Sequence, residues 1–153
     1  MWERLRRFSA LERPARRLFL RASVLLPFIS LSLRLRGFGK TQAFLQKSLT
    51  ASGKIKNPLD PGLPALAARM VRAAGHHGFG PPTCLAESLA LWWLLGREGI
   101  ASDLRVGIRK DGEKFEAHAW VEHEGKALNE PEATHLHYAA FDAALASLPP
   151  GQR

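Results

Sequence analysis

Leu89–Leu95 is an unbroken run of seven apolar residues, and it limits the folds open to this chain. The run follows Thr83, which can cap a helix, and Glu87, which suits the first turn of one. A helix that is apolar around its whole circumference must be surrounded by other elements, because any side left in water would expose apolar surface. We therefore predict that a helix starting at Cys84 is the central helix of the domain.

The residues on either side of this run predict an α+β fold. Before it, apolar residues at helical spacing predict a helix of about three turns from Leu63, capped at Asp60-Pro61 and ended by Gly75. After it, apolar and polar residues alternate in segments 104–109 and 115–122, with a third strand expected near 126–130. Turns are expected at 110–113 and 123–125, so the strands should form an antiparallel sheet.

The positive charge of the chain is concentrated near its start. Residues 1–56 hold 13 Lys and Arg against 2 Asp and Glu, a net charge of +11, whereas residues 57–153 hold 9 against 12, a net charge of −3. We predict two domains with these bounds, a basic helical N-terminal arm at 1–56 and a second domain at 57–153. Such asymmetry indicates that the arm meets an acidic partner, nucleic acid or an anionic membrane surface.

The arm itself is expected to form two or three amphipathic helices over residues 3–50, broken near Pro27 and at 37–39. Its most apolar stretch has only twelve uncharged residues between Arg21 and Arg34, fewer than the roughly 20 that a bilayer span needs. The stretch also lacks the order of features of a signal peptide. The single cysteine of the chain indicates a reducing, cytoplasmic location.

Cys84 is the only cysteine, so an internal disulfide and a zinc site with paired cysteines are excluded. A lone cysteine is usually an inert buried residue. At the first turn of a helix, however, unpaired backbone N–H groups stabilise the thiolate, which is the nucleophilic form. Cys84 is therefore a candidate nucleophile.

A catalytic thiol needs an imidazole and a third group that orients it. His118 is the best candidate, because it lies between Ala117 and Ala119 on an expected strand; the alternative is a half-exposed polar residue. If residues 123–125 form a three-residue loop, His118 lies opposite Glu130, which can then orient the ring, and a two-residue loop would place Pro131 there instead.

These segments resemble a known family. The run Pro-Pro-Thr-Cys-Leu-Ala-Glu-Ser from residue 81 and Phe-Glu-Ala-His-Ala-Trp-Val-Glu from residue 115 are similar to the lasso-peptide maturation proteases. These bacterial enzymes are transglutaminase-like, papain-related cysteine peptidases, whose central helix carries the cysteine and packs on an antiparallel sheet. The resemblance spans residues 63–130, and the basic arm is similar to the N-terminal part of stand-alone members.

The resemblance implies that a Cys-His-Asp triad hydrolyses the bond between the leader and the core of a ribosomally made precursor. Cys84 and His118 match the nucleophile and the base, and Glu130 falls where the family has aspartate. The implied partners are the precursor peptide and a separate leader-recognition protein, and a lasso cyclase is a further candidate. A peripheral membrane contact through the arm is left open, whereas no specific nucleic acid, no cofactor and no metal are predicted.

Other functions remain open on the sequence alone. The same triad could support acyl transfer or deamidation, and a degenerate enzyme fold with a basic arm could act as a non-catalytic adaptor. His76 and His77 are interpreted as surface residues, and the pair His135 and His137 lacks the further ligands that a metal site needs. Ser88, one turn after Cys84, either touches the cleft or fills space.

Overall fold

The fold is described from a computed structural model, over residues 11–50, 60–77, 82–130, 138–140 and 146–147. These residues form three helices and five strands, and all strand pairs are antiparallel. The helices are α2 (Arg13–Thr50), α3 (Leu63–His77) and α4 (Cys84–Arg97), and the strands are β1 (Asp103–Asp111), β2 (Lys114–His123), β3 (Lys126–Ala127), β4 (Ala139–Ala140) and β5 (Ala146–Ser147). The predicted α+β class is confirmed.

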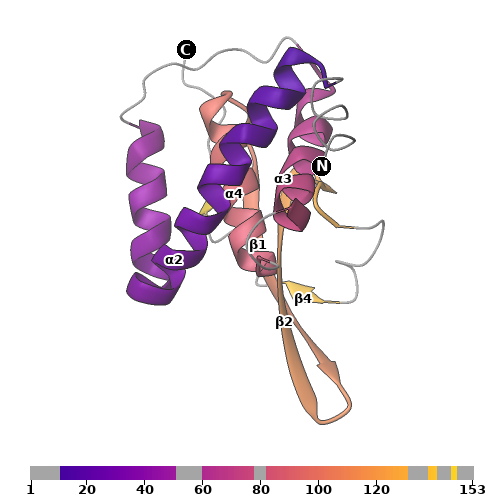
Figure 1. Cartoon of the computed structure of the whole chain (residues 1–153). Coiled ribbons are helices and arrows are strands. Elements are labelled where there is room, and N and C mark those ends of the chain that lie inside the picture. Colours follow the sequence, from indigo (N-terminus) through magenta and orange to yellow (C-terminus); the bar gives the residue numbers. More distant parts are fainter. Residues whose placement is uncertain (1–10, 51–59, 78–81, 131–137, 141–145, 148–153) are drawn as a thin grey trace.

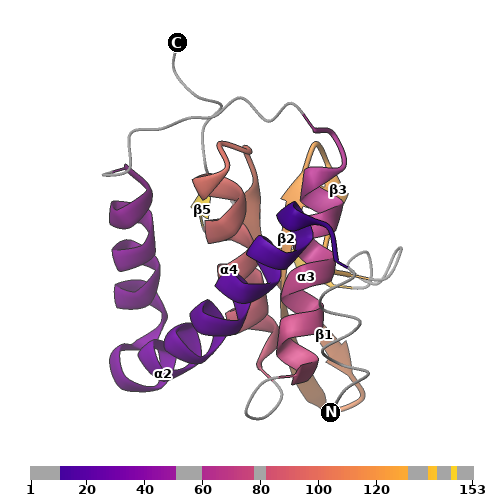
Figure 2. The same ribbon diagram turned by 45° about the horizontal axis from the view of Figure 1, so that its top comes forward.

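The helix α4 lies at the centre of the molecule, as its apolar run predicts. Leu89, Leu91 and Trp92 are fully buried. The helices α2 and α3 cover one side of α4, and the sheet packs on the other (Figures 1 and 2). Every side of α4 is therefore enclosed by another element, which is the condition that an all-round apolar helix requires.

The sheet has the order β3-β2-β1-β4, and β5 pairs with the start of β1. The strands β1 and β2 form a long hairpin that projects from the body (Figure 1). Asp111 pairs with Lys114, so the connecting turn is Gly112-Glu113, with Gly112 at φ 61°. A positive φ is readily adopted by glycine, and the predicted turn is confirmed.

The helix α2 confirms one predicted break and contradicts the other. At Gly37 the backbone leaves the helical region, with φ 76° and ψ 176°, and the chain turns back (Figure 1). The two halves are joined beside this kink by the hydroxyls of Ser32 and Thr41, 2.9 Å apart. At Pro27 the helix continues. Proline has no N–H to donate to the carbonyl of Ser23, but both residues lie on the exposed side of the helix, where water can bind that carbonyl.

The helix α2 shares one hydrophobic core with the rest of the molecule. Its buried Leu18, Ala22 and Ile29 belong to the same cluster as Met70 of α3 and Leu91 of α4. The predicted domain boundary between residues 56 and 57 falls among residues 51–59, outside the described residues, and stays a prediction. A shared core means that α2 stabilises the helices on the far side of that boundary.

One helix, α2, is long and apolar enough to pass a test for a membrane span by length and composition. The most apolar window has a mean hydropathy of 1.6, and 28% of it is buried inside the molecule. Core helices of soluble proteins and signal sequences pass the same test, so this finding alone is weak evidence for a membrane span.

Candidate functional site

Cys84 is the first residue of α4, where the sequence predicts it. Thr83 is the N-cap, and its hydroxyl accepts a hydrogen bond from the backbone N–H of Ala86 at 3.2 Å. The thiol is partly exposed, and the described residues offer it no disulfide partner. The cap leaves other N–H groups of the first turn directed towards the region of the thiol, which favours negative charge there.

His118 lies on β2, opposite Gly107 of β1. Its ring is flanked by Trp120 and Tyr138, with ring centroids 6.4 Å and 5.2 Å away. A Cβ atom at Gly107 would approach the Trp120 ring and the Cβ atom of Tyr138 to 2.9 Å, which is closer than side chains pack. Because Gly107 has no side chain, Trp120 and Tyr138 can occupy the space above it, where both lie beside the imidazole ring.

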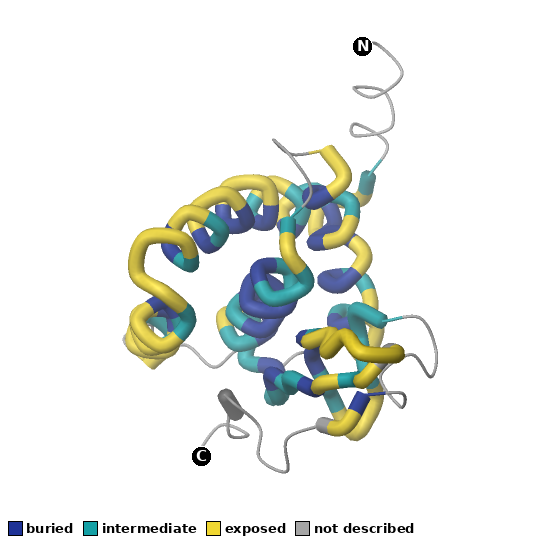
Figure 3. The backbone as a smooth tube through the Cα atoms, turned by 90° about the horizontal axis from the view of Figure 1, so that it is seen from below, coloured by how far each residue is buried: buried dark blue, intermediate teal, exposed yellow. Residues whose placement is uncertain are grey.

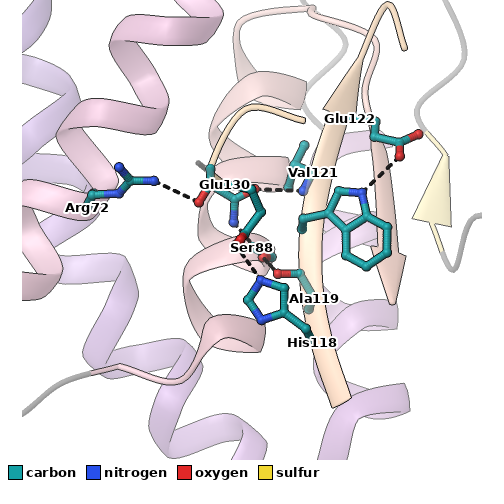
Figure 4. Close-up of polar contacts among 9 residues, drawn as sticks. Arg72, Ser88, His118, Ala119, Val121, Glu122 and Glu130 are labelled. Carbon is teal, nitrogen blue, oxygen red and sulfur yellow. Dashed lines mark hydrogen bonds and ion pairs between the residues drawn. The ribbon is translucent and has the colours of Figure 1, made fainter. Parts of the chain in front are cut away.

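The imidazole of His118 contacts the carboxylate of Glu130 through Nε2 and Oε1 (Figure 4). The Glu130 side chain is only 9% exposed and that of His118 is 19% exposed, so the contact is largely shielded from water. Because a carboxylate oxygen accepts a hydrogen bond, Nε2 must carry the hydrogen. The other ring nitrogen, Nδ1, is then the one that can take up a proton.

The hairpin register that predicts this pairing is wrong, although the two residues do meet. His123 pairs with Lys126, so the turn has two residues, Glu124 and Gly125, at φ 50° and 75°. Continued pairing from this turn would place Pro131 opposite His118. The ladder instead ends at β3, and the chain that follows bends so that Glu130 reaches the ring by another route.

Asn129 holds this bent segment in place. Its side-chain oxygen accepts a hydrogen bond from the backbone N–H of Val121 at 2.8 Å, and its Nδ2 donates to the Ser88 hydroxyl at 2.9 Å. Its backbone carbonyl accepts a hydrogen bond from Arg72 of α3 at 2.8 Å. Figure 4 shows these contacts converging beside Glu130. Asn129 and Arg72 are members of the site that the sequence alone does not identify, because their partners are 8 to 57 residues away.

Ser88 connects the central helix to the strand that carries the histidine. It is fully buried, and its hydroxyl donates to the carbonyl of Ala119 at 2.9 Å. The sequence leaves open whether this residue touches the cleft or fills space, and the structure gives it a third role as a hydrogen-bonded link between α4 and β2. A buried hydroxyl with both a donor and an acceptor role satisfied fixes the spacing of the two elements.

This link also indicates how Cys84 lies relative to His118. Nδ1 of His123 contacts the carbonyl of Ala101, four residues after the end of α4, at 2.7 Å, so the chain leaves α4 towards the end of β2 and the two elements run in the same direction. One helical turn back from Ser88 to Cys84 is about 6 Å along the helix, and His118 lies one residue, about 3.3 Å, back from Ala119 along the strand. The first turn of α4 therefore lies at the level of the part of β2 that carries His118.

Glu87 adds a charge next to this site. Burial raises the pKa of its carboxyl above the ordinary value of 4.5, Arg72 and His76 act in the opposite direction, and the Glu130 carboxylate raises it further. A Cβ atom at Gly75 would lie 2.7 Å from the Glu87 carboxylate, so this glycine allows close packing and does not end α3, which continues to His77. The predicted helix end at Gly75 is thus wrong.

A second charged group lies on the other side of the histidine. Arg109 forms an ion pair with Glu116 and lies over the Tyr138 ring, 5.0 Å from its centroid. The Arg109 guanidinium lowers the pKa of the Glu116 carboxyl, whereas burial raises the pKa of the Tyr138 hydroxyl. Arg109 therefore ties the tyrosine that flanks His118 to the β1–β2 hairpin.

Within the part of the chain that the structure describes, no cluster of three or more His, Cys, Asp and Glu could hold a metal ion. His135 and His137, which lack the further ligands that a metal site needs, lie outside the described residues. The candidate residues are a thiol, an imidazole and a carboxylate, a set suited to nucleophilic chemistry.

Comparison with protein families places the chain in a superfamily. A model described as the transglutaminase-like superfamily matches residues 25–141, which include Cys84, His118 and Glu130. Comparison with curated proteins and with solved structures gave no significant match. Members of the superfamily are generally cysteine-dependent enzymes. Because the match covers more than half of the chain, the protein belongs to the transglutaminase-like superfamily.

Proposed function

We propose that this protein is a cysteine peptidase that hydrolyses the bond between the leader and the core of a lasso-peptide precursor. Cys84 is the nucleophile, His118 the general base and Glu130 the group that orients the imidazole. The observation that carries the proposal is the contact between Nε2 of His118 and Glu130, beside the helix that begins at Cys84. The superfamily supports cysteine chemistry, and the sequence motifs support the substrate class.

The hydrogen bond to Glu130 decides how the thiol is activated. With the hydrogen held on Nε2, Nδ1 accepts the proton from the Cys84 thiol. The resulting thiolate is stabilised by the imidazolium and by the start of α4. It attacks the carbonyl carbon of the scissile peptide bond, and the oxyanion that forms is stabilised by the backbone N–H of Cys84 as one donor.

The His118 imidazolium then completes the first half of the reaction. It gives its Nδ1 proton to the leaving nitrogen, the C–N bond breaks, and the core peptide departs with a free amine. The leader remains attached to Cys84 as a thioester. Water, deprotonated by His118, attacks this thioester, releasing the leader with a new carboxylate and restoring the thiol.

The partners in this proposal are a leader-recognition protein that presents the precursor and a cyclase that uses the freed amine of the core. Hydrolysis is the reaction that supplies this amine. The expected location is the bacterial cytoplasm, where one unpaired cysteine stays reduced.

Acyl transfer and deamidation form the competing class of reaction, and superfamily membership favours them as much as it favours a peptidase. All three reactions proceed through the same thioester with Cys84. The reactions differ in which acyl group forms the thioester and in whether an amine or water then accepts that acyl group.

Mass spectrometry of a lasso-peptide precursor, incubated with this protein and the leader-recognition protein, tests the proposal. Peptidase activity yields leader and core as two products whose masses sum to the precursor plus one water. Acyl transfer at a side-chain amide would add the mass of the amine less that of the ammonia released, and deamidation would increase the mass by about one unit without cleavage. Cleavage by a folded Cys84→Ala variant, with folding checked by circular dichroism, would contradict the assigned nucleophile.

A further inference from the structure

A row of large apolar side chains lies in water along α2. Their spacings of four, four, three and four residues place them on one side of the helix. The exposed fractions are 52% for Leu20, 74% for Val24, 45% for Phe28, 57% for Leu31 and 74% for Leu35. We call these five residues the apolar stripe. Burying such side chains is favourable, so a continuous stripe of this kind marks an interaction surface.

Basic residues border the apolar stripe at both ends. Arg13 and Arg17 precede it, Arg34 and Arg36 lie at its far end, and all four are exposed. Arg17 and Arg34 are about 26 Å apart along the helix, at 1.5 Å per residue. The whole of α2 contains no Asp or Glu, so its positive charge is not neutralised within the helix. The charge of a matching surface must be negative.

The opposite side of α2 packs against the rest of the protein. Leu18, Ala22 and Ile29 are buried in the core, and Arg21 forms an ion pair with Glu98 of α4 at 2.8 Å. Figure 3 shows α2 buried towards α4 and exposed on its outer side. To cross a bilayer, α2 would have to leave this core. The packing instead suits a helix that lies along a surface, with its apolar side in contact.

We propose that the apolar stripe docks this protein on an anionic lipid bilayer, with α2 lying in the membrane plane. The apolar side chains enter the boundary between headgroups and acyl chains, and the arginines at both ends contact lipid phosphates. After the kink at Gly37, Phe44 contacts Phe28, with ring centroids 5.9 Å apart, and widens the apolar surface. The absence of acidic residues on α2 favours a lipid surface over a protein surface, which usually presents both signs of charge.

The layers of the molecule give the docked protein a defined orientation. The helix α4 lies between α2 and the sheet (Figure 3). His118 on the sheet is therefore separated from the apolar stripe by the central helix, and Glu130 contacts His118. A membrane-bound molecule would therefore keep its candidate site open to water. This inference does not rest on the proposed peptidase activity.

Co-sedimentation of the full chain with lipid vesicles tests the inference. Vesicles of phosphatidylcholine and phosphatidylglycerol at a ratio of about 7:3 should bind the protein, and pure phosphatidylcholine should bind it much more weakly. Added salt should weaken the binding. The triple variant Leu20→Gln, Val24→Gln, Leu31→Gln should partition at least about tenfold less. Arg34→Gln should reduce binding about fivefold.

A matched control replaces exposed apolar residues elsewhere. Ile108 and Phe115 on the projecting hairpin are 39% and 73% exposed, and Ile108→Gln with Phe115→Gln should leave vesicle binding unchanged. Binding of the Cys84→Ala variant should also be unchanged, which separates this inference from the proposed reaction. The inference is overturned if the parent chain does not bind anionic vesicles or if the triple variant binds them equally well. It is also overturned if the triple variant loses only its binding to the leader-recognition protein.

Discussion

The two hairpins that include β2 are built in different ways. The β1–β2 hairpin is a regular ladder of nine residue pairs closed by Gly112-Glu113, and its register follows the turn. The β2–β3 hairpin has two residue pairs. Beyond them, the backbone N–H of Val121 donates to the side chain of Asn129 and not to a backbone carbonyl of the neighbouring strand. The first hairpin thus follows local turn chemistry, whereas the second depends on contacts with α3 and α4. The candidate site lies on the second.

The largest effect is expected where the second hairpin meets the histidine. Glu130→Gln keeps the size of the side chain and removes its charge, so we predict a loss of roughly 10 to 1000-fold in turnover with little change in KM. Glu130→Asp should retain substantial activity, since it still offers a carboxylate. The control is Glu113→Gln, a glutamate in the turn of the first hairpin, which should behave as the parent does. Parent-like kinetics for Glu130→Gln would reduce Glu130 to a structural residue.

Asn129 provides the next test, because it replaces the missing ladder. Asn129→Ala leaves the buried N–H of Val121 and the hydroxyl of Ser88 without this partner, which should lower the free energy of unfolding by about 2 kcal/mol. As a positioning residue for Glu130, it should also reduce turnover by about tenfold at saturating substrate. Chemical denaturation measures the first effect and steady-state kinetics the second. Lower stability with unchanged turnover would mean that Asn129 supports the fold alone.

The two turn glycines sharpen the same comparison. Gly112 and Gly125 both have positive φ, at 61° and 75°, and no atom within 4 Å of an added Cβ. Replacing either by alanine should therefore cost a similar free energy of unfolding, about 1 kcal/mol, from backbone strain alone. Only Gly125→Ala should also lower turnover, by a few-fold, because only that turn leads to Glu130. Equal turnover in both variants would show that the site does not depend on the second turn.

The smallest effect concerns Glu87, whose charge lies next to that of Glu130. Because burial raises the pKa of Glu87 above 4.5 in the folded state, the folded chain binds this proton more tightly than the unfolded chain. Stability from this group is then greatest below pH 4.5 and is lost as pH rises through the raised pKa. Glu87→Gln should be more stable than the parent at pH 7, by less than about 1 kcal/mol, and equal at pH 4. A difference that grows at low pH, in thermal unfolding, would contradict this.

The sequence predicts well what depends on nearby residues. The central helix, its start at Cys84 with Thr83 as cap, and the turn at Gly112 are all confirmed. Each depends on a pattern within a few positions, such as all-round apolarity or one glycine with positive φ. The break at Gly37 is confirmed for the same reason.

The second turn, by contrast, depends on residues that are distant in the sequence. A single glycine, Gly125, favours a three-residue loop. The observed two-residue turn also places Glu124 at positive φ, which is unusual for a residue other than glycine. The hydrogen bonds of Asn129 to Val121 and Ser88 come from distant segments and can offset this local cost. No spacing in the sequence indicates these partners. The break predicted at Pro27 is wrong for a similar reason. Whether that position is exposed to water depends on how α2 packs, which the local sequence does not indicate.

The ion pair between Arg21 and Glu98 has a consequence for how this chain is made. Its two residues are separated by 77 positions, and α2 can cover the part of its inner face that packs on α4 only once α4 exists. At synthesis rates of about 5 to 20 residues per second, Glu98 leaves the ribosome roughly 4 to 15 s after Arg21. During that interval the part of α2 that packs on α4 is in contact with water. A newly made chain therefore exposes this apolar surface until its core is complete.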